Sequence, residues 1–159
     1  MNINIICIGK IKEKFLKDAV NEYVKRISRF AKVKITELPD EAVPEKMSEA
    51  EEKNVLKKEG EKILAALSPS DYVIALCVEG KQMGSVELAE HLSECFLRGK
   101  SSISFIIGGS LGLLEEVKKR SSLRLSFSKM TFPHQLMRII LLEQVYRCFK
   151  INANETYHK

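Results

Sequence analysis

The sequence has no tryptophan, only four cysteines and four prolines, and no apolar run long enough to cross a bilayer. The cysteines form no CxxC pair and do not cluster with histidine, so the usual spacing of a zinc site is missing and we expect no metal. The apolar stretch 1–8 has no basic residues before it and ends at Gly9-Lys10, which is unlike a signal peptide. We therefore expect reduced, buried thiols in a cytoplasmic protein that is not a membrane protein.

The common nucleotide-binding motifs are also missing. A dinucleotide-binding fold would place GxGxxG early in the chain and an acidic residue about 20 positions later. The only glycine cluster here is 108–112, late in the chain, and the residues about 20 positions further on are Ser128 and Lys129. No GxxxxGK followed by Ser or Thr is present either. Nicotinamide chemistry and nucleotide hydrolysis are both disfavoured.

The composition is that of one folded domain. The chain has 159 residues, of which 45% are hydrophobic and 30% are charged, so it can bury a substantial core. Lys and Arg exceed Asp and Glu by 26 to 21, which gives a net charge of +5. This excess mildly favours a polyanionic partner such as RNA, although a basic protein without such a partner is nearly as compatible with it.

Strand-like and helix-like segments alternate along the whole chain. Apolar runs at 3–8, 33–38, 72–78, 103–107 and 123–125 predict strands, and the first, third and fourth suit strands buried on both faces. Amphipathic or apolar helices are predicted between and after them, at 13–27, 48–67, 85–98, 113–119 and 133–150. This order predicts an α/β fold, with a mostly parallel sheet and helices on both faces.

Glycine follows three of the five expected strands, at Gly9, Gly80 and the pair Gly108-Gly109. Glycine allows close approach of the backbone, and ligands of open α/β sheets bind outside the carboxyl ends of the strands. If the last three strands are neighbours, the segments 76–80, 107–109 and 127–132 would converge there. This edge of the sheet is the predicted ligand site.

The segment 126–132 reads as a tight loop between a strand and a helix. It carries two hydroxyls and Lys129 between the aromatic residues Phe127 and Phe132. Such a loop suits a flat heteroaromatic ligand with polar edges, for example adenine. An ordinary strand-to-helix turn, with Pro133 in the first turn of the helix, explains the same residues without a ligand.

The predicted last helix is apolar nearly all round, which indicates burial on more than one side. Because it belongs to an outer layer of a small domain, we expect its second face to contact another protomer in a homodimer. Arg138, Glu143 and Arg147 would then lie near the interface or the ligand site. Glu143 and Arg147 are four residues apart, so a simple ion pair is the alternative.

The chain ends with Tyr157, His158 and Lys159. A frayed terminus is the ordinary expectation for such a polar tail. An aromatic ring, an imidazole and a cation together could instead stack on a base, move a proton and contact phosphate.

Several of these segments together resemble the RlmH family, bacterial 23S rRNA (pseudouridine-N3)-methyltransferases of the SPOUT superfamily. The matching motifs are Gly9-Lys10, Leu38-Pro39-Asp40-Glu41, Ile107-Gly108-Gly109-Ser110, the loop from Ser126 to Gln135, Glu143-Gln144-Val145-Tyr146-Arg147 and Tyr157-His158-Lys159. The resemblance covers the whole chain.

The resemblance implies a single domain whose C-terminal part, at about 104–159, forms a trefoil knot. It implies a homodimer that binds S-adenosylmethionine and methylates N3 of a pseudouridine in 23S rRNA of the assembled ribosome, without a metal. By position, the implied cofactor contacts are Leu76, Gly108, Phe127, Ser128, Lys129, Met130, Thr131 and Phe132. The implied RNA contacts are Arg147, Tyr157, His158 and Lys159, and the candidate catalytic residues are His158 and Arg138.

Two other readings stay open. One is a SPOUT methyltransferase that acts on another RNA base, and the other is a ribosome-binding module that has kept the fold without catalysis.

Overall fold

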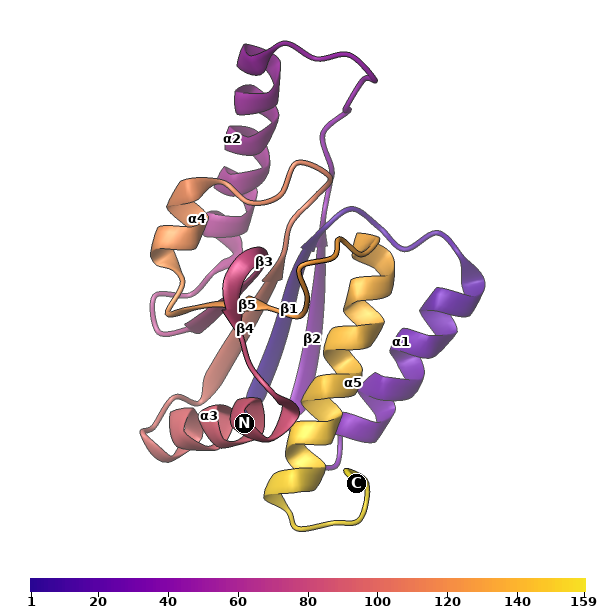
Figure 1. Cartoon of the computed structure of the whole chain (residues 1–159), viewed down its shortest axis with the longest axis vertical. Coiled ribbons are helices and arrows are strands. Elements are labelled where there is room, and N and C mark those ends of the chain that lie inside the picture. The colour runs from indigo at the N-terminus through magenta and orange to yellow at the C-terminus, as the bar shows by residue number, and fades with distance from the viewer.

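The computed structural model describes residues 1–159 and contains five strands and five helices in strict alternation (Figure 1). In chain order they are β1 (Asn2–Ile8), α1 (Lys14–Ile27), β2 (Lys32–Leu38), α2 (Glu49–Ala66), β3 (Tyr72–Gln82), α3 (Ser85–Leu97), β4 (Ser102–Ile107), α4 (Glu115–Arg120), β5 (Leu123–Ser126) and α5 (His134–Asn152). This is the predicted order of elements. None of the five helices is both long enough and apolar enough to cross a membrane.

The five strands form one parallel sheet in the order β2-β1-β4-β3-β5. The strand β2, in which apolar and polar residues alternate, lies at an edge of the sheet. The three strands whose ends were expected to converge, β4, β3 and β5, are indeed neighbours. Their carboxyl ends therefore meet on one edge of the sheet, where ligands of such folds bind.

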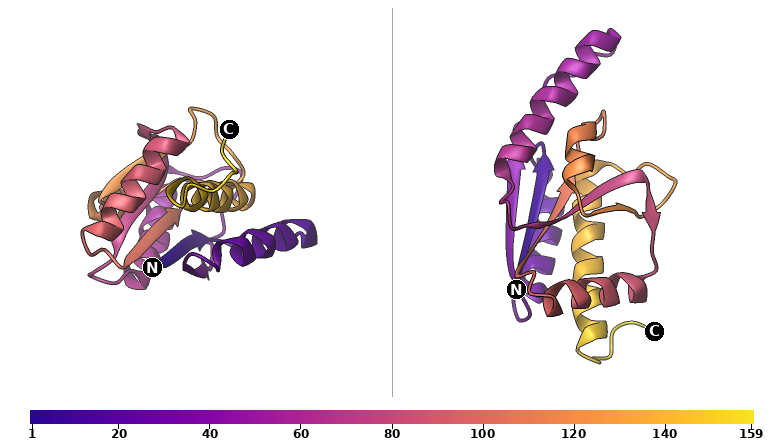
Figure 2. Two further views of the ribbon diagram at one scale, coloured as in Figure 1. Left: turned by 90° about the horizontal axis from the view of Figure 1, so that it is seen from below. Right: turned by 90° about the vertical axis from the view of Figure 1, so that its left-hand side faces the viewer.

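Helices cover both faces of the sheet, as expected from strands that are apolar on both sides. The larger core cluster lies between the sheet and α1, α3 and α5, with Phe105 and Leu142 fully buried in it. The smaller cluster lies on the opposite face, where Ile63 of α2 and Val117 of α4 pack against the sheet. The helix α5 packs against both α1 and α3, beside α1 in the views of Figures 1 and 2.

The strand β3 is longer than predicted, because it resumes its pairing after an irregularity. Its pairing with β5 breaks after Leu76 and starts again at Lys81, so the residues between them are displaced from the ladder. A Cβ at Gly80 would lie 2.8 Å from the backbone carbonyl carbons of Arg124 and Leu125, so only glycine fits at this crossing. The displaced segment becomes one wall of the site described below.

Two helix starts differ from the predictions. Pro133 is the N-cap residue of α5 and not its first helical residue. The helix α3 is capped at Gly84, whose N–H donates to the Glu87 carboxylate at 2.6 Å, while the Ser85 hydroxyl donates to Gln144 at 2.7 Å. The Ser85 hydroxyl therefore connects α3 to α5 instead of capping α3. The trefoil knot and the single-domain assignment stay predictions.

Candidate functional site

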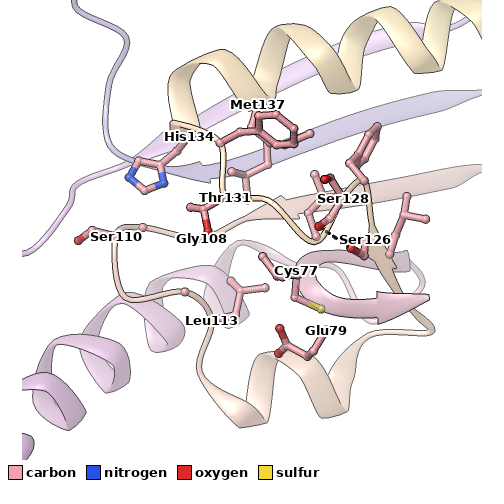
Figure 3. A pocket seen from close by; sticks show the side chains of 18 of the residues that line it. Cys77, Glu79, Gly108, Ser110, Leu113, Ser126, Ser128, Thr131, His134 and Met137 are labelled. Carbon is pink, nitrogen blue, oxygen red and sulfur yellow. Dashed lines mark hydrogen bonds between the residues drawn. The ribbon is translucent and has the colours of Figure 1, made fainter. Parts of the chain in front are cut away.

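A cavity of about 400 Å³ opens at the carboxyl ends of β3, β4 and β5, and we call it the strand-end cavity (Figure 3). Its lining comes from three separate segments, one residue of α4 and the start of α5: Leu76, Cys77, Val78, Glu79, Ile107, Gly108, Gly109, Ser110, Leu111, Gly112, Leu113, Lys118, Leu125, Ser126, Phe127, Ser128, Met130, Thr131, Phe132, His134 and Met137. The volume is within the range that holds a nucleoside-sized ligand. The predicted convergence of three strand ends is confirmed.

The glycine cluster after β4 folds into a closed turn against the cavity. The Gly112 N–H donates to the carbonyl of Gly109 at 3.1 Å, and Gly112 has a φ of +85°, which glycine adopts without strain. A Cβ on Gly108 would come within 2.5 Å of the Gly112 carbonyl oxygen. The two ends of the turn are therefore packed backbone against backbone, and any larger residue at 108 would spread them.

The loop after β5 is held by its own hydroxyls. Ser126 donates to the carbonyl of Ser128 at 3.0 Å, and the Ser128 hydroxyl accepts the N–H of Met130 at 3.0 Å. These bonds fix the loop while Phe127 and Phe132, both half-buried, contribute aromatic surface to the cavity. A preformed loop of this kind binds a ligand at a lower entropic cost than a mobile one.

The cavity is weakly charged. Its charged side chains, Glu79 and Lys118, form an ion pair with each other, and the hydrogen bond from Lys118 lowers the pKa of Glu79. Burial raises the pKa of the Cys77 thiol, which keeps it protonated. Burial, helped by the charge of Arg138, lowers the pKa of His134 below its usual value, so its imidazole is neutral near pH 7.

Seven of the eight expected cofactor contacts line the strand-end cavity, and Lys129 is the exception. Its side chain is exposed, so Lys129 can contribute to the site through its backbone. The lining also includes residues that were not singled out from the sequence, among them Leu113, Lys118, His134 and Met137. Leu113 could have been predicted, because it directly follows the glycine cluster 108–112. Lys118 and Met137 reach the cavity only through the packing of α4 and α5.

Arg138 does not line the cavity. Its side chain is 1% exposed and points to the ends of β1 and β2, where it forms an ion pair with Glu37 at 2.7 Å. It also donates to the carbonyls of Gly9 at 2.7 Å and Ile8 at 3.2 Å. These contacts give Arg138 a structural function in the chain, and its catalytic role stays a prediction.

The C-terminal tail is not frayed at Tyr157, so that alternative is wrong there. The Tyr157 ring packs edge-on against Tyr146 at 4.9 Å between centroids, and its hydroxyl donates to Glu143 at 3.1 Å. The Arg147 guanidinium lies over the same ring, forms the predicted ion pair with Glu143 at 2.6 Å, and is 3.2 Å from Nδ1 of His158. The residues expected to bind RNA therefore form one cluster on α5 and the tail, apart from the exposed last residue, Lys159.

This tail cluster and the strand-end cavity lie at opposite ends of α5 (Figures 1 and 2). The tail folds back against Glu143 and Arg147, which lie about 14 and 20 Å along the helix from His134 at 1.5 Å per residue. None of the tail residues lines the cavity of its own chain.

The family model described as "Predicted SPOUT methyltransferase" matches residues 1–158. The chain belongs to the SPOUT methyltransferase family. Two relatives with the name ribosomal RNA large subunit methyltransferase H are 58% identical (Clostridium novyi strain NT) and 59% identical (Bacillus thuringiensis strain Al Hakam), and each alignment covers all of both chains. The resemblance inferred from the sequence motifs is confirmed.

Two solved structures share the fold at 13% sequence identity. A methylase family protein from Haemophilus influenzae Rd KW20 has a TM-score of 0.55, with 99% of this chain and 70% of that chain covered. A Legionella pneumophila methyltransferase, solved with the cofactor SAM bound, has a TM-score of 0.51, with coverages of 94% and 66%. These likenesses support the α/β architecture of the SPOUT family.

The residues that line the strand-end cavity fit S-adenosylmethionine, the methyl donor of this family. Aromatic and aliphatic side chains can enclose the adenine, and the glycine-rich turn and the loop after β5 bring backbone polar groups to its edge. The cavity contains no unpaired cation that would repel the positive sulfonium, because Lys118 is neutralised by Glu79. Seven positions predicted from the motifs would make these contacts.

Proposed function

We propose that this protein transfers a methyl group from S-adenosylmethionine to a base of large-subunit ribosomal RNA. The observation that carries the proposal is the strand-end cavity, built from the three strand ends at which cofactor contacts were expected. Full-length relatives at 58% and 59% identity that are named for methylation of this RNA support the choice of substrate. The net charge of +5 is consistent with a polyanionic partner.

The finer proposal is that the methylated atom is N3 of a pseudouridine in 23S rRNA and that the substrate is the assembled ribosome, which places the protein in the cytoplasm. The sulfonium of the bound cofactor supplies an activated methyl group. The protein therefore has to orient the base for in-line attack and remove the N3 proton. The chain contributes the orientation through the fixed turn at Gly108 and the fixed loop at Ser128.

The working unit is proposed to be a homodimer. Several apolar side chains of α5 are not fully buried by their own chain: Ile139 and Ile140 are half-buried, and Leu136 is 41% exposed. A second copy that covers this surface would bring its tail cluster toward the strand-end cavity, which no tail residue of the same chain lines. Arg147, Tyr157, His158 and Lys159 of one chain would then hold RNA at the site of the other.

Calorimetry and RNA mass spectrometry together test this proposal. The purified protein is expected to bind S-adenosylmethionine, and rRNA from a deletion strain is expected to lack a methylated pseudouridine. Absence of cofactor binding would favour a ribosome-binding module without catalysis. Loss of a methyl group from a different base would favour a methyltransferase with another target. Returning the gene for this chain to the deletion strain should restore the methylated pseudouridine in the mass spectrum of the rRNA.

A further inference from the structure

The strand-end cavity contains one imidazole, that of His134, which is the first residue of α5. In Figure 3 its ring is drawn on the same side of the cavity as Ser110, and Ser110 and Thr131 are both exposed, so this is an open end of the cavity. Cys77 and Glu79, from the displaced part of β3, line another side of the cavity, where Glu79 is also exposed. A base that enters the cavity on the side of Ser110 and Thr131 passes the His134 imidazole.

We propose that His134 is the group that accepts the proton from the target nitrogen during methyl transfer. The proposal rests on the function proposed above, because it assumes an imide N–H as the nucleophile. His134 is a half-buried imidazole on the wall of the cavity, where a general base has to lie to come within hydrogen-bond reach of the substrate proton.

In the proposed step the N–H bond of the base breaks and its proton moves to the free ring nitrogen of His134. The nitrogen lone pair forms a bond to the methyl carbon of S-adenosylmethionine as the carbon–sulfur bond breaks, and that bonding pair stays on sulfur as a neutral thioether. The imidazolium of His134 then releases its proton to solvent at the open end. Charge is conserved, since the positive charge of the sulfonium is passed to the imidazolium and then to water.

The surroundings of His134 keep it in the form that can accept a proton. Arg138, one turn further along α5, opposes a second positive charge, and its own position is fixed by Glu37 and two carbonyls. Asp40, on the segment between β2 and α2, acts in the other direction and can stabilise the imidazolium once it forms. Burial outweighs Asp40, and the pKa of His134 is lowered overall.

The other titratable groups are less suited to this step. The Glu79 carboxylate is engaged by Lys118, and the Cys77 thiol has a raised pKa. His158 lies at the other end of α5 in its own chain and is in contact with Arg147 through Nδ1. In a dimer the partner copy could bring a second His158 to the site, so the experiment must separate the two imidazoles.

The test compares His134→Gln with His158→Gln in the full-length protein, by single-turnover methylation of ribosomes across pH. His134→Gln is expected to lower the rate at pH 7 by about 100-fold or more. It should also remove the change of slope at the pKa of the imidazole: the wild-type rate levels off above that pKa, whereas the rate of the variant keeps rising toward alkaline pH as the substrate ionises itself. His158→Gln is expected to lower the rate and to keep the wild-type pH dependence, because its role is in RNA binding.

Two measurements that do not depend on turnover complete the test. Calorimetry should give the same S-adenosylmethionine affinity for wild type and His134→Gln, and NMR titration of the three imidazoles should give His134 a pKa below its usual value. The proposal is overturned if His134→Gln keeps the wild-type pH profile or loses cofactor affinity. It is also overturned if His158→Gln, and not His134→Gln, removes the change of slope at the pKa of the imidazole. Failure of the wild-type protein to methylate ribosomes would refute the proposed function itself.

Discussion

Arg138 of α5 and Glu37 of β2 form an ion pair at 2.7 Å although they are 101 residues apart in the chain. The guanidinium is almost completely buried, whereas the Glu37 side chain is 35% exposed. The same carboxylate accepts the N–H of Ile11 at 2.8 Å. One pair of side chains therefore connects the start of the last helix, the edge strand and the segment after β1.

Replacing Arg138 should therefore destabilise the fold. Arg138→Ala leaves two buried carbonyls and the Glu37 carboxylate without their donor, and we expect a loss of about 3 kcal/mol in the free energy of unfolding. Denaturant titration measures it. Arg98→Ala is the matched control, because the Arg98 pair with Glu94 is exposed and its removal should change little. Equal effects of the two substitutions would contradict the structural role.

The glycine turn offers a prediction about cofactor binding. Gly108→Ala places a Cβ within 2.5 Å of the Gly112 carbonyl oxygen, so the turn must open. We expect a stability loss of about 1–3 kcal/mol and weaker binding of S-adenosylmethionine. Calorimetry and thermal unfolding measure the two effects.

Gly84→Ala is the matched control for that substitution. Its Cβ would meet only the end of the Glu87 side chain, at 3.4 Å, so the protein should keep wild-type affinity for the cofactor. A Gly108→Ala protein that binds the cofactor as tightly as the control would show that this turn does not shape the site.

The sequence predicted the elements of the fold better than their contacts. Buried strands are visible as apolar runs and their ends as glycines, because these features depend on local residues. The Arg138–Glu37 pair has no local signal, since it depends on β2 and α5 coming together in space. The polar tail suggested fraying, but Tyr157 is held by Glu143 and Tyr146, which lie three residues apart on α5.

A pH-dependent prediction concerns Glu59 of α2, which is buried behind the glycine turn. One carboxylate oxygen accepts the N–H of Glu41 at 3.3 Å, and the other, beside Gly109, has no hydrogen-bond partner. Burial raises the pKa of Glu59, so the folded state holds this proton to a higher pH than the unfolded state does. Its contribution to stability is therefore present at low pH and is lost as the pH rises through the raised pKa.

Glu59→Gln removes this dependence, because the amide does not titrate. The difference in unfolding free energy between Glu59→Gln and wild type should shift in favour of the variant between pH 4 and pH 7. Denaturant titrations of both proteins at the two pH values measure the shift, and other ionisable groups cancel in the comparison. A difference that is the same at both pH values would show that Glu59 does not titrate differently in the folded state.

Removal of Tyr157, His158 and Lys159 should separate methyl transfer from cofactor binding. None of these three residues lines the strand-end cavity of its own chain, so the truncated protein should keep its affinity for S-adenosylmethionine. Methylation of ribosomes should fall by about 100-fold, since the residues proposed to hold the RNA base in place would be missing. Calorimetry and methyl incorporation measure the two quantities, and Lys159→Arg, which keeps the charge, should retain activity. Loss of cofactor affinity in the truncated protein would instead place the tail in the cofactor site. In that case, mixing truncated chains with full-length Gly108→Ala chains, whose cavity is defective, would fail to restore methylation.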